Sequence, residues 1–390
     1  MTGFGNLDLD ELGAVLKQRG LDGWLVYDFH DLNPIAKRLL TIRGMMTRRV
    51  FIWLPAVGPA QLVVHGIDRP SIGEFPGEIR VYSTWQDLQQ AVSDLVRGRR
   101  VAVETSPENA VPYLDLIPHG VVELLTRLGA TLVPSAPLIT QFASRWSAAE
   151  LEDHRYAAEA IAKIARETVT RVIAQVGRAN EWAVQQDVLA DLAANGLMTE
   201  EPPIVGFGPN SANPHYAPEE SGSRTLRAGE VVLLDLWARR SERTVWADQT
   251  WMGFAGKEVP AEVLEVWSAV REARDAAVDK LRAAMKAGEK VNGGMLDTVA
   301  RGVLVRHGYG EYFTHRTGHS IDLGLHGSGP HLDDFETHDN RELMPGVAFS
   351  IEPGVYLTGR FGVRSEINVV LGVDGPEVTP RDVQQDLITT

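Results

Sequence analysis

Four acidic residues interrupt stretches that otherwise have the pattern of buried strands. Asp235 ends the apolar run VVLLD, Asp248 lies in VWADQTW, Glu352 in AFSIEPGVY and Glu366 in VRSEINVV. Aspartate and glutamate are rare in strands and almost never buried unless they are paired or bind a metal. Each acid alone could instead face water from an edge strand. As a set, the four predict a shared cation site, and any fold of this chain must then bring them together.

The available ligands restrict the kind of cation. The sequence has no cysteine, which excludes disulfides, thiolate zinc sites, iron–sulfur clusters and cysteine nucleophiles. Carboxylate oxygens combined with imidazole suit Mn²⁺, Co²⁺ or Zn²⁺ better than copper. Four carboxylates around two divalent ions would leave the charges nearly balanced. We therefore expect a site made of oxygen and imidazole ligands.

Histidines gather in one short segment. Five of the eleven, His315, His319, His326, His331 and His338, fall between residues 315 and 338. A polar loop rich in histidine is one interpretation, and a metal or catalytic site is the other. The first two have the spacing of an HExxH zinc motif, but the segment reads HRTGH and lacks the glutamate. This excludes a single-zinc protease of that type.

Composition excludes several classes of partner. The net charge is −14, from 38 basic and 52 acidic residues, which argues against nucleic acid and anionic membranes as partners. The N-terminus lacks the pattern of a signal peptide, and no apolar run is long enough to span a membrane. We therefore expect a cytoplasmic protein with no membrane partner.

The length of 390 residues favours two domains, and the hydrophobic periodicity changes near residue 145. Residues 1–145 alternate between helical and strand patterns, which predicts an α/β domain. Within it we expect a hairpin that turns at Gly58-Pro59, a helix that begins at Thr84, and a helical stretch over 114–129. The domain has no glycine-rich phosphate loop, so it is not predicted to bind nucleotides.

Residues 146–390 form a second predicted domain. A capping box of Ser147 and Glu150 starts a long amphipathic helix that ends near Gly177. More helices and strands follow, before a strand-rich C-terminal stretch. The expected helices cover 181–196, 260–287 and 293–307, and the expected strands cover 231–238 and 244–254.

Asp235, Asp248, His319, Glu352 and Glu366 and their neighbours resemble those of the pita-bread metallopeptidases. This is the family of methionine aminopeptidase, aminopeptidase P, prolidase and creatinase. The matching motifs are Asp248-Gln249-Thr250, Gly318-His319, the EPGVY of 352–356 and Arg364-Ser365-Glu366. The likeness extends from residue 146 to about 375, and the N-terminal domain is similar to the extra domain of prolidase, aminopeptidase P and creatinase. It implies an α+β fold in which a smaller N-terminal α/β domain precedes a pita-bread catalytic domain.

The resemblance also implies five metal ligands. Asp248 and Glu366 would bridge two divalent ions, Asp235 would complete one site, and His319 with Glu352 would complete the other. Mn²⁺ is the first expectation, with Co²⁺ and Zn²⁺ as alternatives. A hydroxide between the ions would attack the peptide bond, and Glu352 would also carry a proton from the water to the leaving nitrogen.

Further residues are implied to contact the substrate. His326, His215 and His315 resemble histidines that bind the substrate or its intermediate, although each could instead be structural. Arg364 resembles an arginine that meets the substrate carboxylate, and the alternative is a partner of Glu366. In dimeric relatives the N-terminal domain overhangs the active site of the partner. We therefore expect the segment from Tyr27 to Asp31, with Tyr27, Asp28 and His30, to limit substrate length, unless it is a polar surface turn.

Three positions depart from the family pattern. Asp235 and Asp248 are further apart than is usual, Trp237 replaces a common glycine, and RSEIN stands where RxED is usual. These departures concern the subfamily more than the metal site.

The first expectation for function is therefore an Xaa-Pro dipeptidase (prolidase) that acts on a small peptide and forms a homodimer. Aminopeptidase P, which acts on longer peptides, is the alternative. Creatinase-like hydrolysis without metal and a non-catalytic pita-bread binding protein are further alternatives, and the retention of all five ligands argues against both.

Overall fold

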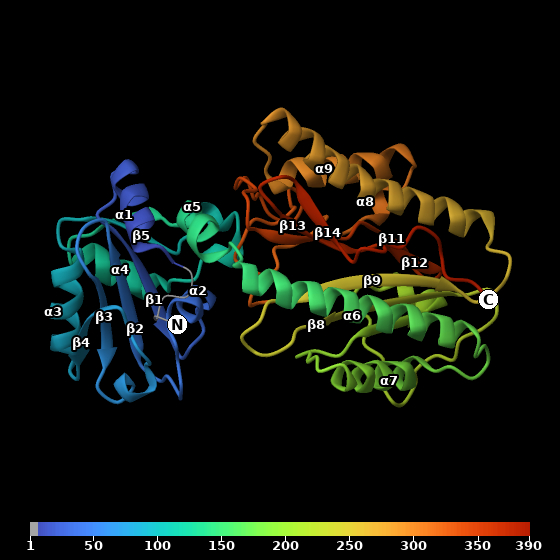
Figure 1. The fold of residues 1–390 in the computed structure, drawn as a ribbon, viewed down its shortest axis with the longest axis horizontal. Coiled ribbons are helices and arrows are strands. Elements are labelled where there is room, and N and C mark those ends of the chain that lie inside the picture. Colours follow the sequence, from blue (N-terminus) through green and yellow to red (C-terminus); the bar gives the residue numbers. More distant parts are fainter. Residues whose placement is uncertain (1–6) are drawn as a thin grey trace. The chain divides into compact units, whose positions relative to one another are not determined.

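The structure is a computed structural model, and it describes residues 7–390 of the chain (Figure 1). The chain divides into two compact units between Ser144 and Arg145. The sequence predicts this boundary one residue later, after residue 145. Among the described residues, no helix is both long enough and apolar enough to cross a membrane.

The N-terminal unit is built around one six-stranded sheet. Its strands are β1 (Gly23–Phe29), β2 (Arg49–Pro55), β3 (Ala60–His65), β4 (Gly77–Tyr82), β5 (Arg100–Val103) and β6 (Thr131–Pro134). The strand order is β4-β3-β2-β1-β5-β6, and β1 is antiparallel to β2 and parallel to β5. The main helices are α1 (Leu9–Gln18), α2 (Pro34–Leu39), α3 (Trp85–Val96) and α4 (His119–Arg127).

Residues 23–27 of strand β1 are buried on both faces, which explains why this part of the strand is apolar. Trp24 and Val26 pack with α1 and α2 on one face of the sheet. Leu25 and Tyr27 pack with α3 and α4 on the other face. Alternate residues of a strand point to opposite faces, so a central strand covered on both sides needs apolar residues at every position.

Local sequence signals explain where these elements begin. The expected hairpin is formed by β2 and β3, and the helix expected to begin at Thr84 is α3, which starts with a capping box of Thr84 and Asp87. The helical stretch expected over 114–129 begins only at His119. Pro118 is the reason, because a proline disfavours helical backbone in the residue before it.

The C-terminal unit combines long helices with three small groups of strands. Its helices are α6 (Ala148–Ile173), α7 (Glu181–Ala194), α8 (Ala261–Ala287) and α9 (Gly293–Arg306). Its strands are β7 (Ile204–Phe207), β8 (Val231–Ala238), β9 (Ala247–Phe254), β10 (Ala348–Ile351), β11 (Gly354–Leu357), β12 (Phe361–Arg364), β13 (Ile367–Leu371) and β14 (Pro376–Thr379). The strand orders are β7-β8-β9, β10-β13-β14 and β11-β12.

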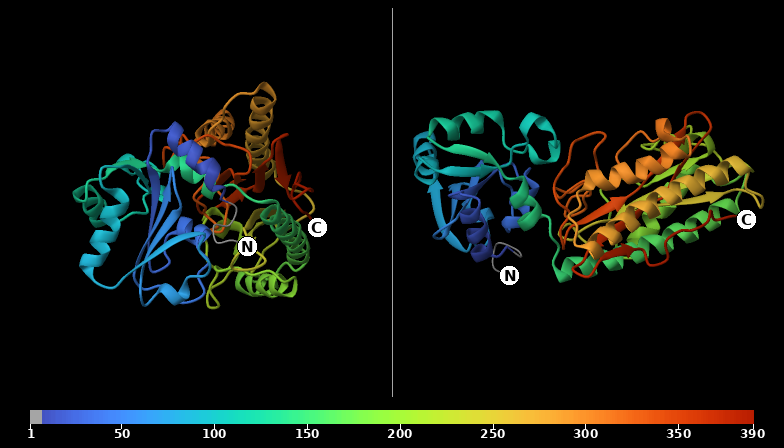
Figure 2. Two further views of the ribbon diagram at one scale, coloured as in Figure 1. Left: turned by 60° about the vertical axis from the view of Figure 1, so that its left-hand side comes forward. Right: turned by 90° about the horizontal axis from the view of Figure 1, so that it is seen from above.

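Two hydrophobic cores lie on opposite faces of the β7-β8-β9 sheet. Val232 and Leu234 of β8 pack with α6 and α7 on one face. Val231 and Leu233 pack on the other face with α8, α9 and the C-terminal strands. Figure 2 shows the green helices α6 and α7 and the orange helices α8 and α9 on opposite sides of the strands. The odd-numbered positions of β8 therefore point towards the second core, and Asp235 belongs to this row.

The long helices begin where their sequences predict, although α6 ends at Ile173, before the expected end near Gly177. The expected capping box starts α6, because the Ser147 hydroxyl accepts from the Glu150 N–H and the Glu150 carboxylate accepts from the Ser147 N–H. Helix α8 ends at Ala287, and the next residue, Gly288, has a φ of 69°, a left-handed conformation that favours glycine.

Candidate metal centre

The strand pair β8–β9 carries two of the predicted ligands on one face. In the antiparallel register Asp235 lies opposite Thr250, and Asp248 lies opposite Trp237. The two aspartates are therefore diagonal neighbours, and residues two apart on a strand share a face. Leu233 on the same face is part of the core formed with α8 and α9. The hairpin thus directs both carboxylates into the interior of the unit.

The other three predicted ligands come from later segments. His319 lies in an irregular segment that is bridged to β10 through Ser320 and Phe349. Glu352 directly follows β10, and Glu366 directly precedes β13. Their apolar neighbours predict positions inside strands, but the two glutamates lie at strand ends. At a strand end a side chain is less constrained by neighbouring strands and can turn towards an ion.

The ligand atoms of these residues converge. One oxygen each of Asp248 and Glu366 and one nitrogen of His319 all lie within 4.8 Å of one another. His319 Nε2 is 3.4 Å from Asp248 Oδ2 and 3.5 Å from Glu352 Oε1. Three carboxylates from distant parts of the sequence thus meet around one imidazole.

Asp235 reaches the same cluster through Thr250. The Thr250 hydroxyl is 3.0 Å from Asp235 Oδ1 and 2.8 Å from Glu366 Oε2. The structure therefore brings all five predicted ligands together within the C-terminal unit.

The cluster is shielded from water. Asp235, Asp248 and Glu366 expose 6%, 5% and 5% of their surface, and His319 is buried as well. The Glu352 side chain is 14% exposed. The alternative in which each acid faces water from an edge strand is therefore wrong for all four.

Burial and mutual repulsion act together on the carboxyl groups. Burial raises the pKa of Asp248 well above its ordinary value, and the charges of Asp235 and Glu352 raise it further. Burial likewise raises the pKa of Glu366, with a further contribution from Asp248. Burial lowers the pKa of His319, which favours the neutral imidazole that binds metals.

Two carboxylate oxygens in the cluster lack a protein partner. Asp248 Oδ1 and Glu366 Oε1 are buried, and neither has a hydrogen-bond partner within residues 7–390. Folded proteins rarely leave such atoms unsatisfied. Divalent cations would satisfy both atoms and offset the repulsion between the acids. Oxygen ligands with one neutral imidazole fit Mn²⁺, Co²⁺ or Zn²⁺, so the residues present fit a metal site.

Arg364 is a buried cation beside these acids. It pairs with Asp235 through Nη2, donates to the Thr250 hydroxyl from Nε at 2.7 Å, and donates to the Tyr356 hydroxyl from Nη1 at 3.3 Å. Each of its three guanidinium nitrogens therefore has a partner within the site. This arrangement favours the interpretation in which Arg364 orients ligand residues over the one in which it meets a substrate carboxylate.

His315 is also committed to neighbouring protein groups. Its Nδ1 is 2.7 Å from the Arg316 carbonyl, so that nitrogen donates, and its Nε2 is 2.8 Å from the Tyr356 hydroxyl, which donates to it. Burial lowers the pKa of His315 to about 3, so the ring is neutral near neutral pH. These contacts favour a structural role for His315.

His326 lies beside His319, and His215 is close enough to His326 to act on it electrostatically. The ring centroids of His326 and His319 are 4.3 Å apart, and the rings meet edge to face. The charge of His319 is the main cause that lowers the pKa of His326, and burial, Arg316 and His215 contribute as well. His215 itself is exposed in the loop before β8. The two histidines are therefore within electrostatic range of each other at the edge of the cluster.

The last two histidines of the 315–338 segment have other roles. The His331 Nδ1 accepts from the Ser320 N–H at 3.1 Å inside the core. His338 is on the surface, where it contacts Asp334 at 2.7 Å. The histidine-rich segment thus contains one residue of the cluster, His319, and other histidines with contacts elsewhere.

The predicted substrate loop lies in the N-terminal unit and contains a strained turn. His30 and Asp31 both adopt left-handed backbone, with φ of 64° and 56°. The Asp28 carboxylate supports the turn by accepting from the N–H groups of Asp31 at 3.0 Å and Asn33 at 2.8 Å. Tyr27 is buried in the core, whereas His30 is exposed. Such strain in non-glycine residues is often associated with function.

Sequence reasoning missed the residues that hold the ligands in place. Asn368 Oδ1 accepts from the Asp248 N–H at 2.9 Å, and its Nδ2 donates to the Asp248 carbonyl at 2.7 Å. The Ser350 hydroxyl accepts from the His319 N–H at 2.9 Å and donates to Glu352 at 3.1 Å. Both are polar residues inside short apolar strands, and that is the signal which could have identified them.

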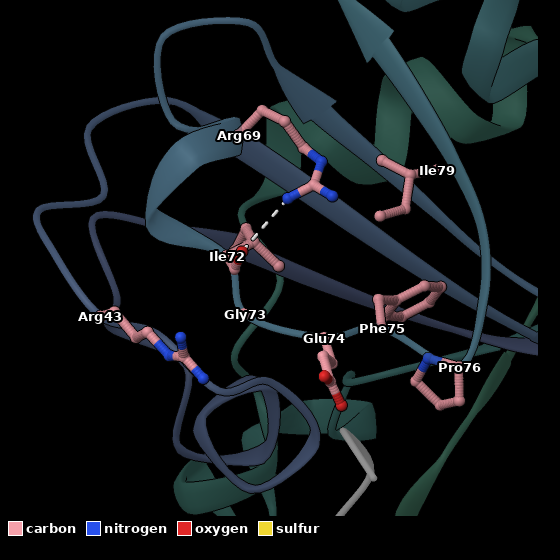
Figure 3. A pocket seen from close by; sticks show the side chains of 8 residues that line it. All are labelled: Arg43, Arg69, Ile72, Gly73, Glu74, Phe75, Pro76 and Ile79. Atoms are coloured by element: carbon pink, nitrogen blue, oxygen red, sulfur yellow. Dashed lines mark hydrogen bonds between the residues drawn. The ribbon is translucent and has the colours of Figure 1, made fainter.

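A separate hollow lies on the N-terminal unit (Figure 3). Its volume is about 550 Å³, and one side is supported by Arg69, which donates to the Ile72 carbonyl at 3.1 Å. None of the predicted site residues lines this hollow. Its lining consists of Arg43, Arg69, Ile72, Gly73, Glu74, Phe75, Pro76 and Ile79.

The fold and the buried cluster of acids and histidine define a class, that of metal-dependent hydrolases with a pita-bread catalytic domain. Comparison with known proteins gives the family. The model of metallopeptidase family M24 matches residues 152–372, and the chain belongs to this family. The predicted α+β fold with a pita-bread domain and the predicted metallopeptidase class are thereby confirmed.

Individual relatives support the same conclusion over nearly the whole chain. The chain is 29% identical to the probable dipeptidase PepE of Mycobacterium tuberculosis over 368 residues, which are 93% of this chain and 90% of that protein. The crystal structure of dipeptidase PepE from Mycobacterium ulcerans has a TM-score of 0.78 and 27% identity, and covers 98% of this chain and 96% of that one. The crystal structure of a prolidase from Thermococcus sibiricus has a TM-score of 0.72 and 26% identity. The match covers 99% of this chain and 100% of that one.

Proposed function

We propose that this metallopeptidase hydrolyses the bond before proline in Xaa-Pro dipeptides, with two divalent ions, of which Mn²⁺ is the first candidate. The observation that carries the proposal is the buried cluster in which Asp248 and Glu366 each keep an oxygen without a protein partner in the described part of the chain. Full-length similarity to proteins named dipeptidase and prolidase supports a dipeptide substrate and a proline after the cleaved bond.

In this proposal five side chains hold the ions. Asp248, Glu366, Asp235, His319 and Glu352 would supply the oxygen and imidazole ligands. Ions held there would acidify a bound water and polarise the carbonyl of the bond to be cleaved. The hydrogen bonds from Thr250 and Arg364 keep the Asp235 carboxylate in a fixed orientation.

Proton transfer and charge stabilisation are assigned to three further groups. Glu352 is the most exposed carboxylate of the cluster, and we assign to it the transfer of a proton to the leaving nitrogen. His326 and His215 donate hydrogen bonds to the substrate oxygen on which negative charge develops. We assign to His315 and Arg364 the orientation of Tyr356 and Asp235, because their polar atoms are already engaged.

The metal part of the proposal is tested by metal content and activity together. Purified protein is loaded with Mn²⁺, desalted and analysed by atomic emission, and close to two ions per chain are expected. Glu366→Ala should lose both bound metal and hydrolysis, whereas the surface variant Glu311→Ala should lose neither. Full activity after exhaustive chelation would refute the metal mechanism, and would also be the result expected of a creatinase-like enzyme.

The substrate part is tested with a matched series of peptides. Ala-Pro should be hydrolysed, Ala-Ala should be a poor substrate, and Ala-Pro-Pro-Ala should be resistant. Rapid cleavage of Ala-Pro-Pro-Ala would identify an Xaa-Pro aminopeptidase instead. Absence of hydrolysis for every peptide, with metal bound, would favour a binding protein.

We propose further that the chain forms a homodimer in which the turn at His30 limits the space for substrate. In the N-terminal sheet Phe29 pairs with Arg49, and His65 pairs with Tyr82. Several large apolar side chains that are close to these residues along the chain are exposed, which is typical of a surface that contacts another chain. They include Leu32 (75% exposed), Met45 (78%), Ile67 (62%) and Trp85 (48%).

Two measurements test this part separately. Light scattering should give twice the chain mass, and the double variant Leu32→Ser with Met45→Ser should shift the protein towards monomer. Kinetics of His30→Ala should show improved cleavage of tripeptides relative to dipeptides. A monomeric wild-type protein, or an unchanged preference in His30→Ala, would contradict the respective claim.

A further inference from the structure

Glu181 is a fully buried carboxylate that neither the metal site nor any motif uses. It is the first residue of α7, and none of its surface is exposed. Its side chain accepts hydrogen bonds from the Phe207 N–H at 2.7 Å, the Arg224 N–H at 2.8 Å and the Tyr216 hydroxyl at 2.7 Å. The Asn210 side-chain amide lies 3.0 Å from both carboxylate oxygens.

These partners all belong to one loop. Phe207 ends β7, Arg224 comes shortly before β8, and Asn210 and Tyr216 lie between them. His215 is the immediate neighbour of Tyr216 in this loop. One carboxylate thus collects donors from the beginning, the middle and the end of the segment that carries His215.

We propose that Glu181 is a positioning residue that holds the 207–224 loop so that His215 faces the metal cluster. The inference rests on the role assigned above to His215. Burying a carboxylate is costly unless it is hydrogen-bonded, so its four partners are held firmly once it is buried. The position of Glu181 in the first turn of α7 also favours negative charge.

The loop has only weak anchors of its own close to His215. The His215 N–H donates to Asn213 Oδ1 at 3.1 Å, and the Tyr216 N–H donates to the Asn213 carbonyl at 3.1 Å. Both are local contacts within the turn. Ser211 ties the loop to β12, because its hydroxyl accepts from the Gly362 N–H at 2.8 Å. The hydroxyl of Tyr216, beside His215, reaches α7 through its contact with Glu181.

The test is a double-mutant cycle between Glu181→Gln and His215→Ala, measured as kcat/KM on Ala-Pro with Mn²⁺. Glutamine keeps the shape but can accept from only one side, so donors at the other oxygen lose their acceptor. We expect Glu181→Gln to lower kcat/KM roughly 10- to 100-fold in the wild-type background. In the His215→Ala background the same change should cost less than about 3-fold, because the residue that it positions is gone.

Hydrogen exchange provides a readout that does not depend on activity. The Phe207 and Arg224 amides donate to Glu181, so peptides that contain them should exchange faster in Glu181→Gln, whereas peptides from β9 and β13 should not change. Tyr216→Phe removes a single donor and should show a smaller loss of activity in the same direction. It keeps the test valid if Glu181→Gln fails to fold.

Gln185→Met is the matched control. Gln185 is buried one turn further along α7, and its Nε2 donates to the Pro203 carbonyl at 2.7 Å, outside the loop. This variant should keep kcat/KM within about 3-fold of wild type, because it does not alter the loop. Equal losses from Glu181→Gln with and without His215 would overturn the inference. Full activity of His215→Ala would instead refute the role assigned to His215.

Discussion

Replacement of Glu104 by glutamine should remove a pH-dependent penalty from the N-terminal unit. Glu104 follows β5 and is completely buried. The Trp24 Nε1 donates to Glu104 Oε1 at 2.6 Å, while Oε2 has no hydrogen-bond partner in the described part of the chain. Burial raises the pKa of Glu104 to about 7, although hydrogen bonds from Trp24, Tyr27, Ser135 and Asn33 oppose the change.

The size and sign of the effect follow from this pKa. The difference between 4.5 and about 7, at about 1.36 kcal/mol for each pH unit, corresponds to about 3 kcal/mol of unfolding free energy. The folded state binds the proton more tightly than the unfolded state does. The penalty is therefore absent below about pH 4.5, grows as the pH rises towards 7, and is complete above about pH 7.

Urea denaturation at pH 5 and pH 8, followed by tryptophan fluorescence, measures the effect. Because the glutamine side chain cannot ionise, Glu104→Gln should gain up to about 3 kcal/mol relative to wild type at pH 8, and little at pH 5. Glu123→Gln, a change at an exposed position of α4, should alter stability by less than about 0.5 kcal/mol at either pH. The reasoning is refuted if wild type and Glu104→Gln keep the same difference in stability at both pH values.

Three other predictions concern the metal site. Asp248→Asn should stabilise the metal-free protein in thermal melts, because burial and the charges of Asp235 and Glu352 raise the pKa of Asp248. Mn²⁺ at about 100 times its dissociation constant should stabilise wild type by about 2.7 kcal/mol and the variant hardly at all. Asn368→Ala should weaken Mn²⁺ binding in calorimetry roughly 10- to 100-fold, and unaltered affinity would contradict its assigned role as a clamp on Asp248. Tyr356→Phe removes the hydroxyl that contacts both His315 and Arg364, and it should lower kcat about 10-fold or more with metal content unchanged. Loss of metal would show that this hydroxyl supports the geometry of the metal ligands.

The sequence was a good guide to elements whose signals are local. The capping boxes at Thr84 and Ser147 start helices as expected, and the hairpin strands β8 and β9 lie where alternating and apolar patterns indicated. Helix α4 begins later than expected because of Pro118. The short helix α2 was not predicted, although Asn33 and Pro34 form a recognisable start, because a helix of six residues has too few turns for periodicity to detect.

The predicted ligand residues could be found from the sequence for a physical reason, whereas the residues that hydrogen-bond to them could not. An acid in an apolar stretch is conspicuous, so Asp235, Asp248 and Glu366 could be selected from the sequence. Which atoms hold such an acid depends on contacts between distant segments, such as Asn368 with Asp248, separated by 120 positions. The same holds for Arg364, which donates hydrogen bonds to Asp235, Thr250 and Tyr356 rather than to its sequence neighbour Glu366.

The arrangement of the cluster places stability and function in opposition. Each buried carboxylate raises the pKa of its neighbours, so the metal-free site resists having all its acids charged at once. The chain opposes this repulsion with a framework of strand pairs, β8 with β9 and β10 with β13, tied together by Asn368 and Ser350. Such a framework cannot relax by moving the acids apart. Protonation of the acids or binding of cations then lowers the energy of the cluster, and a rigid framework that keeps the acids together favours metal binding once they are charged.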